Sequence, residues 1–232
     1  MTFGSLFAGI GGFDLGLERA GMICKWQVEI DPYCRAVLAK HWPEVYRHDD
    51  IRTFGRAEPV DLICGGFPCQ PFSLAGKRRG AADDRHLWPE MLRVIASLRP
   101  TWVLGENVAG FVNMGLDQAI YDLEAEGYAV QTFDIPAVAV DAPHQRHRIW
   151  IVAHAEQQRG RSGTTRREDA TDARQSPGRE TGGFRWDAEP NVGRVAHGVP
   201  ARVDRLRCLG NAVVPQVVEA IGRAILAAEL SR

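Results

Sequence analysis

The sequence lacks several features that mark particular protein classes. Its 5 cysteines are odd in number and form no C-x-x-C pair, so neither a disulfide framework nor a zinc site is indicated. No apolar run approaches the ~20 residues that span a bilayer, and the start of the chain has no basic signal-peptide region. We therefore expect a cytoplasmic protein that binds neither a membrane nor a metal.

The sequence also carries almost no net charge. The 28 basic and 29 acidic side chains nearly cancel, so the composition gives no general signal for a polyanionic partner. Any contact with nucleic acid must come from local basic clusters. Hydrophobic residues at 45% and charged residues at 25% are ordinary for a globular protein, and 232 residues allow one large domain, or one domain with an appendage.

Between residues 2 and 153, short β-branched runs alternate with helical stretches, a pattern typical of parallel strands joined by crossover helices. We expect strands at 3–7, 25–29, 61–64, 102–104, 129–133 and 148–153. We expect helices near 13–20, 32–41, 88–98 and 116–126, where apolar residues recur at helical spacing. The sequence thus predicts an α/β fold.

The composition changes at His154. Residues 156–180 are nearly all Arg, Gln, Gly, Ser, Thr, Asp and Glu, and cannot build a core of their own. We therefore divide the chain into an α/β domain (1–153), a short variable insert (154–192) expected to be mobile, and a carboxyl-terminal segment (193–232). A strong amphipathic helix over 215–230 should return to the first domain.

A glycine-rich turn follows the first expected strand, in Phe7-Ala8-Gly9-Ile10-Gly11-Gly12. Asp14 stands where a dinucleotide fingerprint requires glycine, so the G-x-G-x-x-G pattern fails. The turn still suits close backbone approach by a cofactor, and Glu29 at the end of the second strand can accept hydrogen bonds from ribose hydroxyls. Alternatively, the glycines merely make a tight turn.

Two residues at strand ends are candidates for chemistry. Cys69 lies between two prolines in a turn after a strand, which suits a nucleophile, although most free cysteines are small buried hydrophobes. That second interpretation fits the other four cysteines better. Glu106 follows an apolar run and should face the same edge, where it can hold a proton; a lone glutamate there is more often a surface charge.

The ordered set of these motifs resembles the cytosine-5 DNA methyltransferases of the compact bacterial or phage type. The resemblance lies in 7–12, in Gly66-Phe67-Pro68-Cys69-Gln70, in Glu106-Asn107-Val108 and in Gly210-Asn211-Ala212-Val213-Val214-Pro215. It covers residues 2 to about 151 and 193 to the end. The insert lies where such enzymes place a variable target-recognition region. The resemblance implies a Rossmann-like methyltransferase fold.

The resemblance also implies S-adenosyl-L-methionine as the cofactor. Phe7, Asp50 and Ile51 would contact the adenine, the turn would approach the methionine part, and Glu29 would hold the ribose. Ile30 departs from the aromatic residue common in relatives. The full set implied is Phe7, Gly9, Ile10, Gly11, Gly12, Glu29, Ile30, Asp50, Ile51, Pro68, Leu87, Asn211 and Val213.

For catalysis, the resemblance implies that the Cys69 thiolate attacks carbon 6 of a flipped-out cytosine, which activates carbon 5. Glu106 would hold or protonate ring nitrogen 3. Arg148 would stabilise the base oxygen, and Arg146 would support the site or a phosphate. One departure is His144, which stands where relatives carry glutamine.

Double-stranded DNA is the implied partner, with a cognate restriction endonuclease as a further one, and the chain is expected to be a monomer. The loop over 70–86 should grip phosphates and close over the base; a solvated surface loop is the alternative. Its candidate DNA-binding residues are Gln70, Ser73, Lys77, Arg78 and Arg85.

Other functions stay open on sequence alone. RNA cytosine methylation would use the same chemistry. A catalytically inactive DNA-binding relative would not need Cys69, Glu106 and Arg148 together. Asp14 counts against a nicotinamide-dependent oxidoreductase. For the insert, a passive linker competes with a DNA-reading segment that folds on its target.

Overall fold

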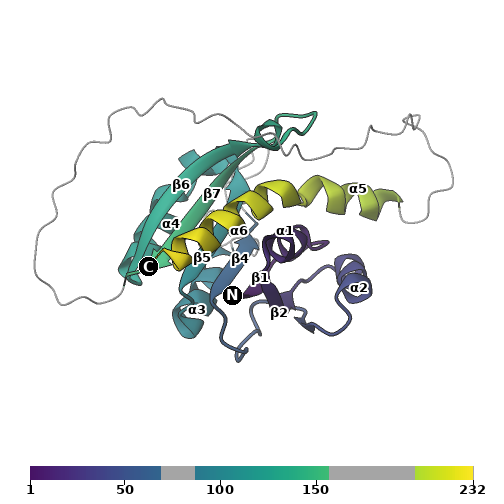
Figure 1. The fold of residues 1–232 in the computed structure, drawn as a ribbon. Helices are drawn as coiled ribbons and strands as arrows, with labels where there is room; N and C mark the ends of the chain where they lie inside the picture. Colours follow the sequence, from purple (N-terminus) through teal and green to yellow (C-terminus); the bar gives the residue numbers. More distant parts are fainter. Residues whose placement is uncertain (69–86, 157–201, 232) are drawn as a thin grey trace, which may run out of the picture.

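The computed structural model describes residues 1–68, 87–156 and 202–231. Within them, seven strands form one mixed sheet with the order β3-β2-β1-β4-β5-β7-β6 (Figure 1). The strands are β1 (Thr2–Leu6), β2 (Ile23–Val28), β3 (Tyr46–His48), β4 (Leu62–Gly66), β5 (Trp102–Val108), β6 (Tyr128–Pro136) and β7 (His147–Ala155). The expected α/β, Rossmann-like architecture is confirmed.

The described helices are α1 (Gly12–Ala20), α2 (Pro32–His41), α3 (Trp88–Leu98), α4 (Leu116–Ala125), α5 (Arg202–Asn211) and α6 (Pro215–Leu230), with short 3₁₀ helices η2 (Ala109–Asn113) and η3 (Ala137–Val140). Local sequence sets their ends. Asp31 caps α2 because its carboxylate accepts hydrogen bonds from the backbone N–H groups of Tyr33 and Cys34, and Pro32 fits the first helical position.

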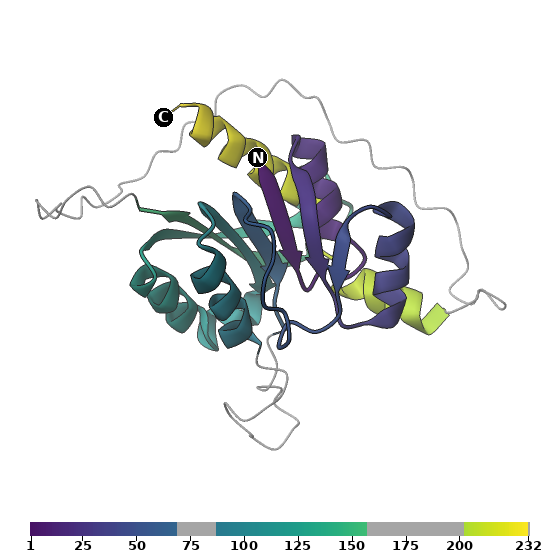
Figure 2. The same cartoon turned by 90° about the horizontal axis from the view of Figure 1, so that it is seen from below.

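Helices cover both faces of the sheet, as the two views in Figures 1 and 2 show. On β4 the side chains alternate: Ile63 belongs to the apolar cluster that includes α3 and α4, whereas Leu62 and Cys64 belong to the cluster that includes α1 and α6. The hydrophobic core is therefore divided into two layers by one sheet.

The carboxyl-terminal helix α6 packs directly on α1. Gly16 makes this possible, because a Cβ atom there would lie 2.5 Å from Cβ of Val218 and 2.6 Å from the carbonyl oxygen of Pro215. Val217, Val218 and Ile225 are buried in the same cluster. The last helix of the chain therefore packs against the first one.

The structure corrects the expectation that every strand is parallel. The strands from β3 to β5 are parallel to their neighbours, but β7 is antiparallel to both β5 and β6. The connection from Pro136 to His147 is too short for a crossover, so β6 and β7 form an antiparallel pair. The short strand β3 and helix α5 were not expected.

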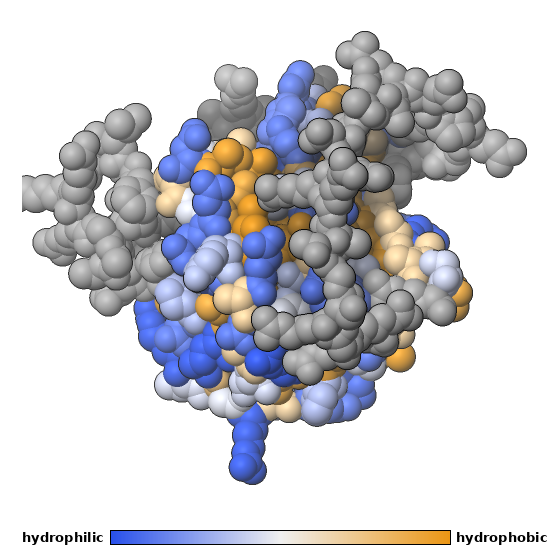
Figure 3. Space-filling model, turned by 90° about the vertical axis from the view of Figure 1, so that its left-hand side faces the viewer, coloured by the Kyte–Doolittle hydropathy of each residue, from blue (hydrophilic) through white to orange (hydrophobic). Residues whose placement is uncertain are grey.

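Hydrophobic and hydrophilic residues are unevenly distributed over the surface (Figure 3). On the side drawn in Figure 3, hydrophobic residues gather in the upper half and hydrophilic residues cover most of the lower half. Val203, Leu206 and Leu209 on α5 are exposed, at 78%, 60% and 63%.

None of the described helices is both long and apolar enough to cross a membrane.

Candidate active site

A pocket of about 640 Å³ opens at the carboxyl ends of β1, β2, β3, β4 and β5. This edge is where open α/β sheets bind ligands, and the volume is in the ordinary range for small-molecule sites. Residues at and after the ends of these strands supply its walls, and the end of α5 with the segment that joins it to α6 completes it. Lining residues from the predicted cofactor set are Phe7, Gly9, Gly12, Glu29, Ile30, Asp50, Ile51, Pro68, Leu87, Asn211 and Val213.

Two residues of that set, Ile10 and Gly11, belong to the same turn but are not among the lining residues of the described pocket. Of the predicted catalytic residues, Glu106 and Arg148 line the pocket. Cys69 lies outside the described residues, as do all five predicted DNA contacts. Pro68, the residue before Cys69, is part of the wall.

The glycine turn is shaped by backbone conformations that side chains rarely adopt. Gly9 has φ +56° and open space around its Cβ position, so this side of the pocket presents backbone rather than a side chain. Its N–H donates a 2.7 Å hydrogen bond to Oε2 of Glu29. The turn after β1 is thereby tied to the end of β2.

Glu29 is 9% exposed. Its Oε2 accepts from Gly9, and its Oε1 accepts a 2.8 Å hydrogen bond from the N–H of Asp31. Burial raises the pKa of the carboxyl, while these two backbone hydrogen bonds oppose the rise. Each oxygen keeps a second acceptor position, so the side chain can still receive hydroxyl hydrogen bonds from a ligand.

The wall beyond β3 is held by an arginine that sequence reasoning missed. Arg93 on α3 donates to the carbonyl oxygens of Ile51 at 2.7 Å and Phe54 at 3.0 Å. Ile51 is buried and Asp50 lines the pocket beside it. No sequence signal pointed to Arg93, because it acts across 42 residues on backbone atoms.

Glu106 on β5 forms the end of the pocket next to β7. Nε of Arg148, which lies on the antiparallel strand β7, is 2.9 Å from its Oε1. Glu106 is 8% exposed. Burial raises the pKa of its carboxyl, and the charges of Arg148 and Arg146 oppose that rise. The site therefore holds a buried carboxyl whose protonated form is favoured by burial and opposed by two guanidinium groups.

Asn107, the next residue, connects this end to the predicted nucleophile loop. Its Nδ2 donates a 3.1 Å hydrogen bond to the carbonyl oxygen of Phe67, and its Oδ1 accepts from the N–H of Val108. Phe67 also packs against Trp88 and Phe111. The chain is thus anchored two residues before Cys69.

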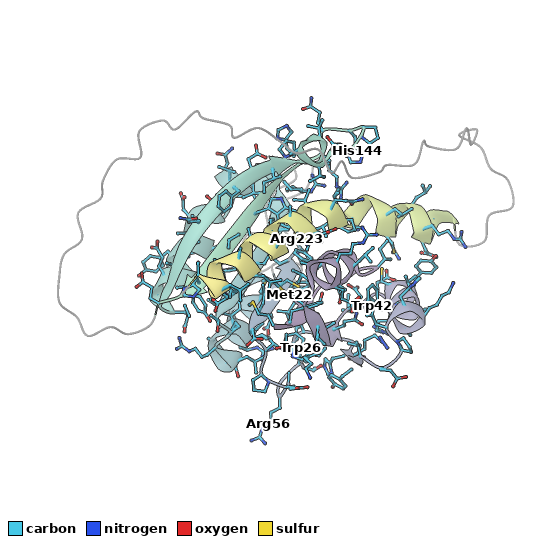
Figure 4. All side chains as sticks on the ribbon, in the orientation of Figure 1. Met22, Trp26, Trp42, Arg56, His144 and Arg223 are labelled. Carbon is cyan, nitrogen blue, oxygen red and sulfur yellow. The ribbon has the colours of Figure 1, made fainter. Side chains whose placement is uncertain are left out.

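Arg146 does not line the pocket. Its Nη2 donates to the carbonyl oxygens of Gly210 at 2.9 Å and Ala212 at 2.6 Å, and its own φ is +37°. This geometry supports the motif over 210–215, called the late motif below, and does not reach into the cavity. His144 is exposed near the ends of β6 and β7, at the top of the molecule in Figure 4, and is not a lining residue.

Beneath the turn lies a buried polar cluster that the sequence did not reveal. Asp14 is fully buried and accepts hydrogen bonds from Ser5 (3.1 Å), Gln27 (2.8 Å) and the Cys24 thiol (3.4 Å). The residue that breaks the dinucleotide fingerprint thus joins α1 to β1 and β2. Burial raises the pKa of its carboxyl, against these hydrogen bonds.

Fold and site together define a Rossmann-like α/β protein whose pocket, at the carboxyl edge of its sheet, holds a buried carboxyl paired with a partly buried guanidinium. Residues 1–187 match the family described as C-5 cytosine-specific DNA methylase. The chain belongs to this family.

Individual relatives agree. The Type II methyltransferase M.HgiCII of Herpetosiphon aurantiacus is 35% identical over 158 residues, which cover 65% of this chain and 36% of that protein. M.HhaI of Haemophilus parahaemolyticus is 31% identical, covering 66% and 48%. A crystal structure of a DNMT2 variant from Spodoptera frugiperda superposes with a TM-score of 0.57 and 25% identity, over 66% and 50% of the two chains. This chain thus spans half or less of these relatives.

Proposed function

We propose that this chain transfers a methyl group from S-adenosyl-L-methionine to carbon 5 of cytosine in double-stranded DNA. The observation that carries the proposal is that one pocket contains both the Glu29 and glycine-turn wall and the Glu106–Arg148 pair, and reaches Pro68 beside Cys69. Family membership and the bacterial Type II methyltransferase relatives support the same activity.

The described residues fit this cofactor. Open space at Gly9 admits a ligand against the backbone, and Glu29 keeps acceptor positions for ribose hydroxyls. Phe7 and Ile51 offer apolar contacts to a planar base, and Ile30, 59% exposed, adds an aliphatic one. When bound, S-adenosyl-L-methionine supplies an electrophilic methyl group.

The chemistry assigned to the chain needs a nucleophile and an acid. The Cys69 sulfur would add to carbon 6 of the base and later leave when the carbon 5 proton is lost. Glu106 would donate a hydrogen bond or proton to ring nitrogen 3, which its raised pKa favours. Arg148 would stabilise the base oxygen while holding Glu106, and Arg146 would act through the late motif.

The α/β domain over 1–153 and the segment over 193–232 would form the catalytic unit, and the insert over 154–192 would contact the target. Gln70, Ser73, Lys77, Arg78 and Arg85 would bind DNA phosphates. We place the activity in the cytoplasm, in a monomer accompanied by a cognate restriction endonuclease.

Methyl transfer from methyl-tritiated S-adenosyl-L-methionine tests the proposal. We expect label in duplex DNA and not in tRNA, and a denaturant-stable adduct with DNA that contains 5-fluorocytosine. Cys69→Ala should lose both signals and keep cofactor affinity, whereas Cys64→Ala should retain both. Labelled RNA with unlabelled DNA would assign the substrate to RNA, and methylation by Cys69→Ala would refute the nucleophile.

A further inference from the structure

Two cysteines from distant parts of the chain meet beside the pocket. Sγ of Cys34 on α2 lies 3.0 Å from Sγ of Cys208 on α5, although 174 residues separate them. Both side chains are buried, at 5% and 6% exposure, and both are free thiols. This contact lies outside the chemistry proposed above, which uses neither residue.

Asp31 lies close enough to make this group a candidate metal site. Its carboxylate is already engaged, because Oδ1 caps α2 through Tyr33 and Cys34, and Oδ2 pairs with the guanidinium of Arg207. A guanidinium beside the group also repels a cation. The arrangement therefore favours a reaction between the two sulfurs over metal binding.

Both residues are among those that line the pocket, so the pocket is the route by which a small solute would approach them. Burial raises the pKa of the Cys34 thiol, and the neighbouring Cys208 and Glu29 add to this rise. Arg207 is adjacent to Cys208 and can stabilise negative charge that develops on sulfur. Cys208 is therefore the thiol placed to react first, and Cys34 is placed to resolve the product.

We propose that Cys34 and Cys208 are a site of reversible disulfide formation that locks α5 onto α2. The oxidant is a low-molecular-weight disulfide. The Cys208 thiolate attacks one of its sulfurs, forms a mixed disulfide and releases the first small thiol. Cys34 then loses its proton and attacks the Cys208 sulfur, which releases the second small thiol. The protein gives up two protons and two electrons, and the small disulfide receives both.

The bond would act on the wall of the pocket. Ile30 and Asp31, which precede α2, and Gly210 and Asn211, which end α5, all line the pocket. A covalent link between these helices would restrict opening of the pocket at this wall. Slower exchange of S-adenosyl-L-methionine rests on the proposed function; the disulfide itself does not.

Peptide mapping tests the site directly. Full-length protein is treated with bis(2-hydroxyethyl) disulfide, alkylated and digested with trypsin. We expect peptides 26–35 and 208–223, each with a single cysteine, to be joined, with a mass about 2 Da below their sum, and to separate on reduction. The link should persist in Cys64→Ala and vanish in Cys34→Ser and in Cys208→Ser, each checked for folding by circular dichroism.

Two results of the mapping would overturn the proposal. The first is the absence of the joined peptides in folded wild type. The second is a link from either peptide to 57–77, which carries Cys64 and Cys69. Zinc that protects both thiols from alkylation at equimolar concentration would instead identify a metal site and also overturn it.

Hydrogen exchange tests the lock without any cofactor. Amide exchange in α5 should slow by about tenfold in the oxidised protein relative to the reduced protein, because the bond removes opened states. Unchanged exchange in α5 would refute the lock. Release of S-adenosyl-L-methionine should slow by a similar factor. If the reduced protein binds no S-adenosyl-L-methionine, the proposed function is refuted, whereas the mapping and exchange results still test the disulfide.

Discussion

Arg148 Nε lies 2.9 Å from Oε1 of Glu106, on neighbouring antiparallel strands. The pair is short and largely shielded from water, with side-chain exposures of 21% and 10%. Burial favours a neutral carboxyl and the guanidinium favours an ionised one. The net shift is a raised pKa for Glu106.

Replacing Glu106 by glutamine should slow methyl transfer by about 10²- to 10⁴-fold, because an amide hydrogen-bonds but does not supply a proton. Cofactor affinity should change little. Single-turnover rates and calorimetric titration measure the two effects, with the exposed Glu124→Gln on α4 as control. An unchanged rate would remove Glu106 from the catalytic set.

The pH dependence should follow from the raised pKa of Glu106. The protonated carboxyl is the donor and is present below this pKa, so kcat/KM should fall as pH rises through it. A pH profile of wild type should show this descending limb above the ordinary range of a glutamate. Glu106→Gln should lack the limb; a limb retained there would assign it to another group.

Arg146→Ala should weaken S-adenosyl-L-methionine binding by about tenfold, because Arg146 donates hydrogen bonds to two backbone carbonyls of the late motif. Loss of one charged hydrogen-bond donor typically costs ~1.5–3 kcal/mol, and part of that cost should fall on the late motif. Asn211 and Val213, which line the pocket, flank the carbonyl at Ala212. Calorimetry measures the change. Arg223→Ala on α6, whose exposed side chain pairs with Glu219, is the control and should bind normally. Equal affinity in both variants would contradict this role.

Asp14→Asn should destabilise the fold by ~1–3 kcal/mol. The carboxylate accepts hydrogen bonds from Ser5, Gln27 and Cys24, and the amide of asparagine would place an N–H donor against one of these donors. Urea unfolding measures the free energy. Glu18→Gln, exposed on the same helix, should be nearly neutral. Equal stability of the two variants would show that the buried cluster does not stabilise the fold.

Gly16→Ala should loosen the contact between α1 and α6 and cost ~1–3 kcal/mol, since the added methyl meets Val218 and backbone of Pro215. Gly55→Ala is the matched control, with nothing within 4 Å of its Cβ position. Thermal unfolding compares the two. A stabilised Gly16→Ala protein would contradict the close packing of the last helix.

Much of the fold followed from local pattern. The ends of α2 at Pro32 and His41 and of α3 at Trp88 and Leu98 were predicted because apolar residues recur there at helical spacing, a pattern encoded within a few residues. The direction of β7 was not, since an isolated apolar run does not specify which way it pairs. Helix α5 was missed: Val203, Leu206 and Leu209 on it are exposed, and Cys208 is the one apolar residue of this helix that is buried.

The sequence by itself determined the α/β class, the glycine turn, and the candidate roles of Glu29, Cys69 and Glu106, because chemistry that needs particular residue types leaves them in short, ordered motifs. Only the tertiary structure decided that Arg148 pairs with Glu106 and that Arg146 holds the late motif. It alone brought Cys34 to Cys208. Such contacts depend on how distant segments pack, and packing is set by the whole chain rather than by any short stretch of it.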